Sequence, residues 1–94
     1  MILFSMDADK TLNQLEELAE RLGITIRYEP LNIAGSVHIG GYCRVKGQDF
    51  VIINKKATSR EKMHVLIDAL KRRDLSEVFM LPSLREILDK TDEQ

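Results

Sequence analysis

Apolar residues recur every three or four positions through residues 12–22, a spacing that places them along one side of an α-helix. The helix is expected to begin near Asp7 or Asp9, because either carboxylate can accept hydrogen bonds from the exposed amides of a first turn. Gly23 is expected to end the helix, since a residue without a Cβ adopts the left-handed conformation at little cost.

The next segment predicts a strand and then a loop. Residues 24–29 alternate strictly between apolar and polar side chains, as a strand with one buried face does. Pro30 is expected to close the strand, because proline cannot donate to a sheet ladder. Residues 31–41 contain three glycines and a serine, which indicates a loop with Val37 and Ile39 as its anchors to the core.

A β-hairpin is expected over the following residues, with Gly47-Gln48 as its two-residue turn. The residues assigned to the core face of this hairpin are Cys43, Val45, Phe50 and Ile52. The residues on its other face are Tyr42, Arg44, Lys46, Asp49, Val51 and Ile53. Residues 50–53 are apolar on both faces, so their strand is expected at the centre of the sheet.

Helices are predicted for the rest of the chain. Thr58 and Glu61 have the spacing of a reciprocal capping box, which marks a helix start. The apolar stripe of that helix consists of Met63, Leu66, Ile67 and Leu70. A short helix is expected over residues 75–80 and a final one over residues 84–90, with Pro82 between them.

These elements predict a small α+β domain in the order α-β-β-β-α-α, with a three-stranded sheet whose hairpin packs against helices. The 94 residues allow a single domain over residues 1–94, with its core in 7–90 and a frayed acidic tail over 91–94. A hydrophobic content of 44% and a charged content of 31% are ordinary for a soluble globular protein.

Cellular location is predicted from what the sequence lacks. The single cysteine, Cys43, cannot form an internal disulfide, which suits a reducing compartment. The apolar start over residues 1–4 is too short for a secretory signal, and no apolar run is long enough to span a membrane. We therefore expect a cytoplasmic protein without membrane association.

Charge is segregated along the chain. Residues 44–73 carry a net charge of +6, whereas residues 1–43 carry −3 and residues 74–94 carry −4. Either the acidic ends neutralise the basic middle in the fold, or the middle presents a basic face to an anionic partner. The cations expected to surround an anion at the start of the second helix are Lys55, Lys56, Arg60 and Lys62. A near-neutral total and few aromatics argue against nucleic acid as the partner.

The order of a helix, a Leu-Gly-Ile strand, a hairpin and a second helix resembles the minimal core of ImmA/IrrE-like zinc peptidases over residues 12–71. That family carries a His-Glu-x-x-His motif on the helix after the hairpin. In this chain Ile67 and Lys71 stand at the two histidine positions and Asp68 at the glutamate position. Isoleucine and a protonated lysine do not bind zinc, so the resemblance implies a peptidase-like scaffold without metal or activity.

Other catalytic and metal chemistry finds little support. His38, Cys43 and His64 match no zinc spacing. Ser36 lies two residues from His38, but no neighbouring carboxylate would orient that histidine. We expect no catalytic residue, metal or cofactor; an enzyme built on Ser36, His38 and Asp68 is the third-ranked hypothesis.

An apolar strip on the outer hairpin face points to a partner instead. Tyr42, Val51 and Ile53 form this strip, which either the C-terminal helices, the first four residues or another chain must cover. The leading prediction is a small cytoplasmic, non-catalytic binding protein, with a homodimer or a protein partner at this strip. The alternative is a regulatory domain that binds a phosphate-bearing ligand or nucleic acid through residues 44–73.

Overall fold

A computed structural model describes residues 3–30, 32–33, 36–37 and 39–90, with side chains for residues 8–30 and 39–90. Its helices are α1 (Leu3–Arg21), α2 (Ser59–Leu70) and α3 (Pro82–Lys90). Its strands are β1 (Thr25–Glu29), β2 (Asn32–Ile33), β3 (Ser36–Val37), β4 (Gly40–Val45) and β5 (Gln48–Asn54). The predicted α+β class and the three-stranded sheet packed against helices are confirmed. None of the helices within the described residues is long and apolar enough to cross a membrane.

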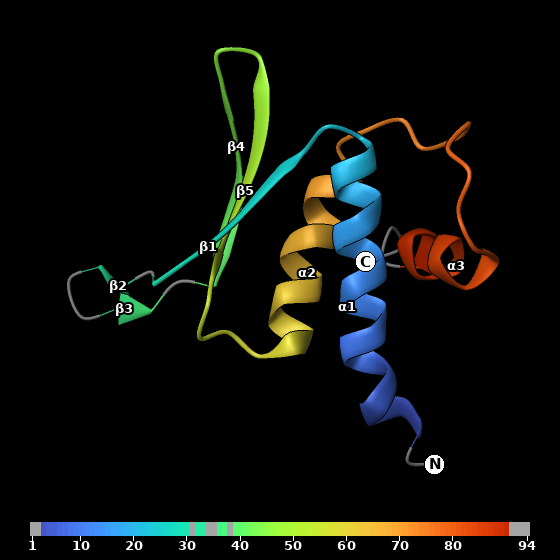
Figure 1. The fold of residues 1–94 in the computed structure, drawn as a ribbon, viewed down its shortest axis with the longest axis horizontal. Helices are drawn as coiled ribbons and strands as arrows, with labels where there is room; N and C mark the ends of the chain where they lie inside the picture. The colour runs from blue at the N-terminus through green and yellow to red at the C-terminus, as the bar shows by residue number, and fades with distance from the viewer. Residues whose placement is uncertain (1–2, 31, 34–35, 38, 91–94) are drawn as a thin grey trace.

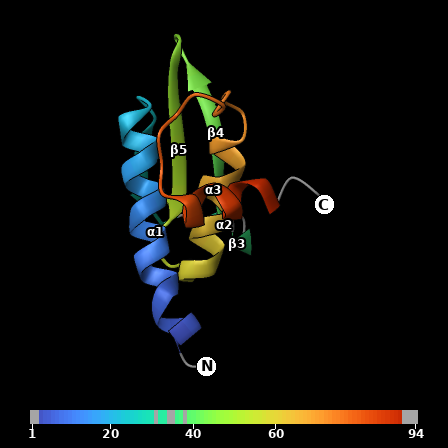
Figure 2. The same ribbon diagram turned by 90° about the vertical axis from the view of Figure 1, so that its right-hand side faces the viewer.

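The main sheet has the strand order β1-β5-β4, with β1 parallel and β4 antiparallel to β5. The strand over residues 50–53 is therefore central, as its apolar run predicted. Figures 1 and 2 show α1 and α2 side by side on one face of this sheet, with α3 against α1 on the far side of the helical layer. Strands β2 and β3 form a separate two-stranded pair beside the sheet.

The core lies between this helical layer and the sheet. Its largest fully buried side chains come from α1, α2, β5 and the residue before β1: Leu15, Leu18, Ile24, Val51, Ile53, Asn54, Leu66 and Leu70. Burying each leucine or isoleucine contributes roughly 1.5–3 kcal/mol of transfer free energy. The periodic spacing of α1 and the apolar stripe of α2 thus supply most of the core, as predicted.

The helix ends follow their local signals in most places. α1 begins at Leu3, before the expected start at Asp7 or Asp9. Gly23 adopts a φ of 82° two residues after the end of α1, which is the left-handed stop expected of it. At α2, the Thr58 hydroxyl accepts from the Glu61 amide and the Glu61 carboxylate accepts from the Thr58 amide, so the capping box is confirmed.

The hairpin turn differs from the predicted one. Lys46 and Gly47 form the turn with φ values of 52° and 80°, so Val45 pairs with Gln48 and Arg44 with Asp49. Positive φ at both central residues is typical of a type I′ turn, whose twist matches that of the strands. A turn at Gly47-Gln48 would pair Lys46 with Asp49 and Val45 with Phe50, so the observed pairs are displaced from the expected ones by two residues along β4. An even displacement keeps every side chain on its predicted face.

The assignment of the two hairpin faces was wrong. The face that packs against α1 and α2 carries Val51 and Ile53, both 0% exposed, and the partly buried Tyr42. The expected core face is the open one: Val45 is 51% exposed, and Phe50 is only partly buried. Alternation along a strand separates two faces but does not say which one the helices cover.

The helix predicted over residues 75–80 does not form. Arginines bind the backbone carbonyls of this segment: Arg85 Nη2 donates to Leu75 at 3.1 Å and to Val78 at 2.6 Å, and Arg21 Nη2 donates to Phe79 at 2.8 Å. The segment runs as an irregular connection that places Met80 in the core. The last helix then begins at Pro82, where a missing amide hydrogen costs nothing.

The glycine-rich segment holds more structure than the expected loop. Asn32 pairs with Val37 and Ile33 with Ser36 across the β2–β3 pair. The side chains of Ser36 and Val37, the whole of His38, and the tail over 91–94 lie outside the described residues.

Candidate functional site

The outer apolar strip predicted for the hairpin is covered by the protein's own helices. Val51 and Ile53 are buried by α1 and α2, and Tyr42 packs against the same core. The sequence left two alternatives for this strip: it is covered by segments of the same chain, or it is covered by another chain. In this fold Tyr42, Val51 and Ile53 offer no free apolar strip to a partner.

The opposite face of the sheet is the more exposed one in the described part of the chain. Its central apolar residues, Phe50 and Ile52 on β5 and Cys43 on β4, are each only partly buried, and Val45 is exposed. No helix within the described residues lies over this face, as Figures 1 and 2 show. We call Cys43, Val45, Phe50 and Ile52 the open face.

Polar and charged side chains border the open face along β1. Thr25, Arg27 and Glu29 point to the same side as Phe50 and Ile52, because their register partners on β5 are Phe50, Ile52 and Asn54. Arg27 and Glu29 form an ion pair at 2.8 Å, with 58% and 35% of their side chains exposed. The border therefore carries both signs of charge and no net charge.

A buried carboxylate on the helix side of the hairpin ties the hairpin to the end of α2. Asp49 is only 4% exposed and accepts hydrogen bonds from the Tyr42 hydroxyl at 2.7 Å and Arg44 Nη1 at 2.8 Å. Its other oxygen accepts from Arg73 Nε at 3.1 Å and Arg73 Nη2 at 2.7 Å. Arg72 stacks over the Tyr42 ring at 4.7 Å. We call these five residues the Asp49 cluster.

The Asp49 cluster favours the ionised carboxylate. Hydrogen bonds from the Tyr42 hydroxyl and then from Arg73 hold the pKa of Asp49 below its usual range, and burial opposes them. Both carboxylate oxygens of Asp49 accept hydrogen bonds from protein donors. The cluster therefore connects β5 to the end of α2. Residue spacing does not predict this cluster, since Asp49 and Arg73 lie 24 residues apart.

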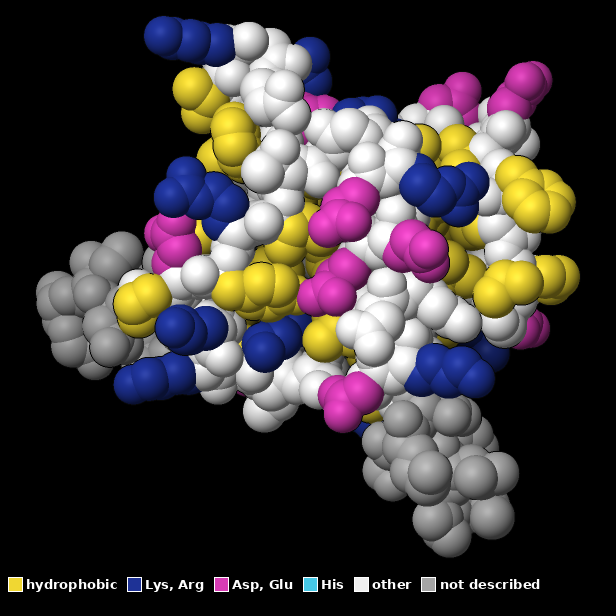
Figure 3. Space-filling view, in the orientation of Figure 1, with side chains coloured by type: hydrophobic (Ala, Val, Ile, Leu, Met, Phe, Trp, Pro, Cys, Tyr) yellow, Lys and Arg dark blue, Asp and Glu magenta, His cyan; other side chains and the backbone are white. Residues whose placement is uncertain are grey.

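The predicted anion site lies where β5 runs into α2, and dark blue side chains gather there at the lower left of Figure 3. Lys55, Lys56 and Arg60 are exposed, and the structure shows no ion pair from any of them to a described carboxylate. The Lys62 ammonium instead lies over the Tyr28 ring, 5.2 Å from its centre. The structure thus brings three of the four predicted cations to one exposed turn.

Side chains of the protein already bind several of the hydrogen-bond donors beside this turn. Glu61 caps the first turn of α2 together with Thr58, and the Ser59 hydroxyl donates to Asp9 of α1. The Tyr28 hydroxyl donates to Glu16, and burial together with that carboxylate raises the pKa of Tyr28. An incoming anion would therefore meet lysine and arginine side chains, with few free amides of the helix.

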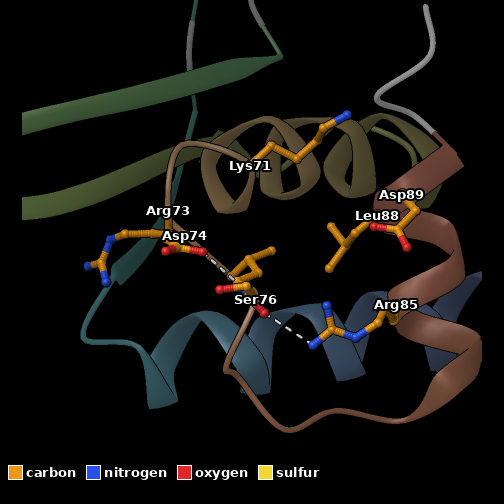
Figure 4. A pocket seen from close by; sticks show the side chains of 8 residues that line it. Lys71, Arg73, Asp74, Ser76, Arg85, Leu88 and Asp89 are labelled. Carbon is orange, nitrogen blue, oxygen red and sulfur yellow. Dashed lines mark hydrogen bonds between the residues drawn. The ribbon is translucent and has the colours of Figure 1, made fainter.

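A pocket of about 340 Å³ lies between α3 and the connection that precedes it. Figure 4 shows Arg85 and Leu88 of α3 facing Ser76, while Arg73 turns away. The Arg85 guanidinium already binds two carbonyls of the connection, and the Asp74 carboxylate accepts from the Ser76 amide, which lowers the pKa of Asp74. These bonds fix the path of the chain, so the polar groups of this pocket serve the fold.

Two large apolar side chains protrude from the same connection. Phe79 is 86% exposed and Leu81 is 54% exposed, and Figure 3 shows hydrophobic side chains standing out over this part of the chain. The connection that carries them runs beside α3, on the far side of the helices from the sheet (Figure 1). They form a second exposed apolar feature that residue spacing did not predict.

Among the described residues, the positions compared with a zinc-peptidase site serve the fold, whereas the side chains of Ser36 and His38 lie outside the described part of the chain. Ile67 is 6% exposed in the core, Lys71 caps the end of α2, and the exposed Asp68 pairs with Arg72 at 3.3 Å. His64 is exposed on α2. No group of three potential metal-binding side chains occurs among the residues that the structure describes.

The fold and these surfaces define a two-layer α+β protein whose sheet has one helix-covered face and one open apolar face. The chain shows no significant match to any protein-family model, curated protein or solved structure. The resemblance to ImmA/IrrE-like peptidases stays a prediction, based on element order and on a few apolar positions.

Proposed function

We propose that this chain is a non-catalytic protein-binding domain whose open face receives an amphipathic helix of a partner protein. The observation that supports this proposal is the position of Phe50 and Ile52. They lie on the central strand, on the face that none of the described helices covers. Exposed apolar side chains that lie next to one another are typical of interaction surfaces.

A helix suits this face better than a flat protein surface does. Sheets with parallel strands usually carry helices on both faces, and β1 is parallel to β5. Three strands are roughly 14 Å wide, which matches a helix of about 10 Å diameter. Arg27 and Glu29 at the border could pair with charges beside the apolar stripe of such a helix.

The non-catalytic part of the proposal rests on the sequence. At the positions where a zinc peptidase would place its histidines, this chain has Ile67 and Lys71. Ile67 packs in the core, where its burial stabilises the fold. Partner binding would use the opposite side of the sheet, so the proposal does not depend on any relationship to peptidases.

Replacing Phe50 with serine is expected to weaken partner binding at least about thirtyfold, because aromatic residues at interface centres carry much of the affinity. Phe79→Ser is the matched control, since Phe79 is exposed on the connection before α3, and this connection lies on the far side of the helices from the sheet (Figure 1). Proteins retained by the immobilised wild type and by both variants are compared, and each retained protein is then titrated against all three. A protein that binds the Phe50→Ser variant as tightly as the wild type would contradict the proposal.

A second proposal, anion binding, is favoured by one observation: Lys55, Lys56 and Arg60 are exposed beside one another without a described carboxylate partner. Three such cations attract a phosphate-bearing ligand electrostatically. This site lies at the start of α2, so both binding functions could reside on one molecule.

Inorganic phosphate is expected to raise the melting temperature of the wild type. With a dissociation constant of about 1 mM, phosphate at about 10 mM would stabilise the folded state by about 1.4 kcal/mol. Lys55→Glu should abolish this effect, whereas Lys46→Glu at the hairpin turn should retain it. Equal protection of both variants, or none in the wild type, excludes a phosphate site at Lys55.

A further inference from the structure

Strand β1 is an edge of the main sheet, because β5 is its only strand neighbour among the residues that the structure describes. The Lys55 amide donates to the Glu29 carbonyl at 3.0 Å, which shows that the peptide groups of Glu29 face β5. Peptide groups alternate in direction along a strand, so those of Ile26 and Tyr28 face outward. This edge therefore presents two residues whose amides and carbonyls can pair with another strand.

Only three antiparallel registers let two copies of β1 pair through these outward groups. They place the twofold axis at Ile26, at residue 27 or at Tyr28. The axis at residue 27 would set Arg27 against Arg27 of the other copy, and the axis at Ile26 would set it against Thr25. The axis at Tyr28 sets Arg27 of each copy directly against Glu29 of the other.

We propose that two copies of this chain form a dimer by antiparallel pairing of their β1 strands about a twofold axis at Tyr28. The two Tyr28 residues would exchange a pair of backbone hydrogen bonds, and each Ile26 amide would donate to the Pro30 carbonyl opposite. Pro30 has no amide hydrogen, so the ladder ends there. The result is a continuous six-stranded sheet.

The charges at this edge are complementary between copies. Arg27 and Glu29 lie on the open-face side, where two crossed Arg–Glu pairs would replace the single pair within each chain. Such pairs occupy the positions where opposing side chains are closest. On the helix side, each copy brings one Glu16 and one Lys62 to Tyr28, so opposite charges balance there as well.

Pairing at β1 also joins the two open faces into one. Phe50 and Ile52 of both copies would then lie on the same side of the extended sheet, roughly doubling its apolar area. The dimer does not require the proposed helix partner. Phe50→Ser should leave the dimer intact, so failure of one proposal is distinguishable from failure of the other.

Charge reversal tests the register. R27E and E29R should each be monomeric at about 100 µM in sedimentation equilibrium, with dimer affinity at least about tenfold below that of the wild type. The double variant R27E/E29R restores opposite charges across the axis and should dimerise as the wild type does. Circular dichroism confirms that each variant is folded before its mass is measured.

Mixing the two single variants gives the sharper test. R27E has two acidic residues at the edge and E29R has two basic ones, so a mixture should form heterodimers although each variant alone is monomeric. A pairing centred on residue 27 would not gain from the double reversal, because like residues would still oppose each other. A wild type that stays monomeric, a double variant that stays monomeric, or a mixture without heterodimers would overturn the proposal.

Discussion

Gly40→Ala is expected to destabilise this protein by about 3 kcal/mol or more, a large share of the roughly 5–15 kcal/mol that holds a domain folded. Gly40 has a φ of 132°, which side-chain-bearing residues rarely adopt. A Cβ at this position would lie 2.2 Å from the Ile52 carbonyl oxygen and 2.8 Å from the Ile53 Cα. Both atoms are backbone of the central strand, so relief of the overlap would require parting β4 from β5.

The neighbouring glycine provides the control. A Cβ on Gly41 would meet no atom within 4 Å, and no unusual φ restricts it. Gly41→Ala should therefore change the free energy of unfolding by about 0.5 kcal/mol or less. Urea denaturation of both variants measures the difference. Equal stability of the two alanine variants would show that β4 does not approach β5 as closely as the structure has it.

Asp49→Asn is the second change with a large expected effect. It keeps the shape of the side chain but removes the charge that Arg44 and Arg73 share. The Arg73 guanidinium would lose a carboxylate to which it donates hydrogen bonds from two nitrogens. The amide nitrogen of asparagine cannot replace a carboxylate oxygen, because it does not accept hydrogen bonds. We expect the melting temperature to fall by about 5–10 °C.

Asp68→Asn is the matched control, because Asp68 also pairs with an arginine but has 67% of its side chain exposed. An exposed pair four residues apart on a helix contributes little, so a shift of about 2 °C or less is expected. A similar loss from both substitutions would mean that the Asp49 cluster is no stronger than an ordinary surface pair.

The same two proteins, wild type and Asp49→Asn, also reveal the pH dependence. The pKa of Asp49 is lowered in the folded state, so its ionisation stabilises the fold above the unfolded-state pKa of about 3.9. That stabilisation is lost as the pH falls toward the folded-state pKa. The melting-temperature difference between the two proteins should therefore be constant at neutral pH and should shrink below about pH 4. A difference that does not change between pH 3 and pH 7 would contradict this assignment.

Much of the secondary structure was predictable because its signals are local. The leucine spacing of α1, the stop at Gly23 and the capping box of Thr58 and Glu61 act within one or two helical turns. The apolar run over residues 50–53 correctly placed its strand at the centre of the sheet. The missing helix over residues 75–80 shows the limit, because distant Arg21 and nearby Arg85 take the carbonyls of that segment.

The candidate surfaces were harder to predict because they depend on which face the helices cover. Val51 and Ile53 were assigned to the outer hairpin face, under cover of the same chain or of a partner, yet they lie in the core. Phe50 and Ile52 were expected in the core, yet they lie on the open face. Both pairs are apolar, so the sequence pattern does not distinguish the face that the helices cover from the face that stays open. The cationic turn at Lys55 and Lys56 was found from the sequence, since it consists of neighbours in the chain.

By itself, then, the sequence determined the three helices that form within the described residues, the central strand, the α+β class and the absence of a zinc-binding histidine pair at Ile67 and Lys71. Only the tertiary structure decided which side of the sheet is open, where Asp49 finds Arg73, and that β1 is left as an edge. The reason is physical: helix starts and stops are set by neighbouring residues, whereas docking of α1 and α2 is set by the total apolar surface that each alternative arrangement buries.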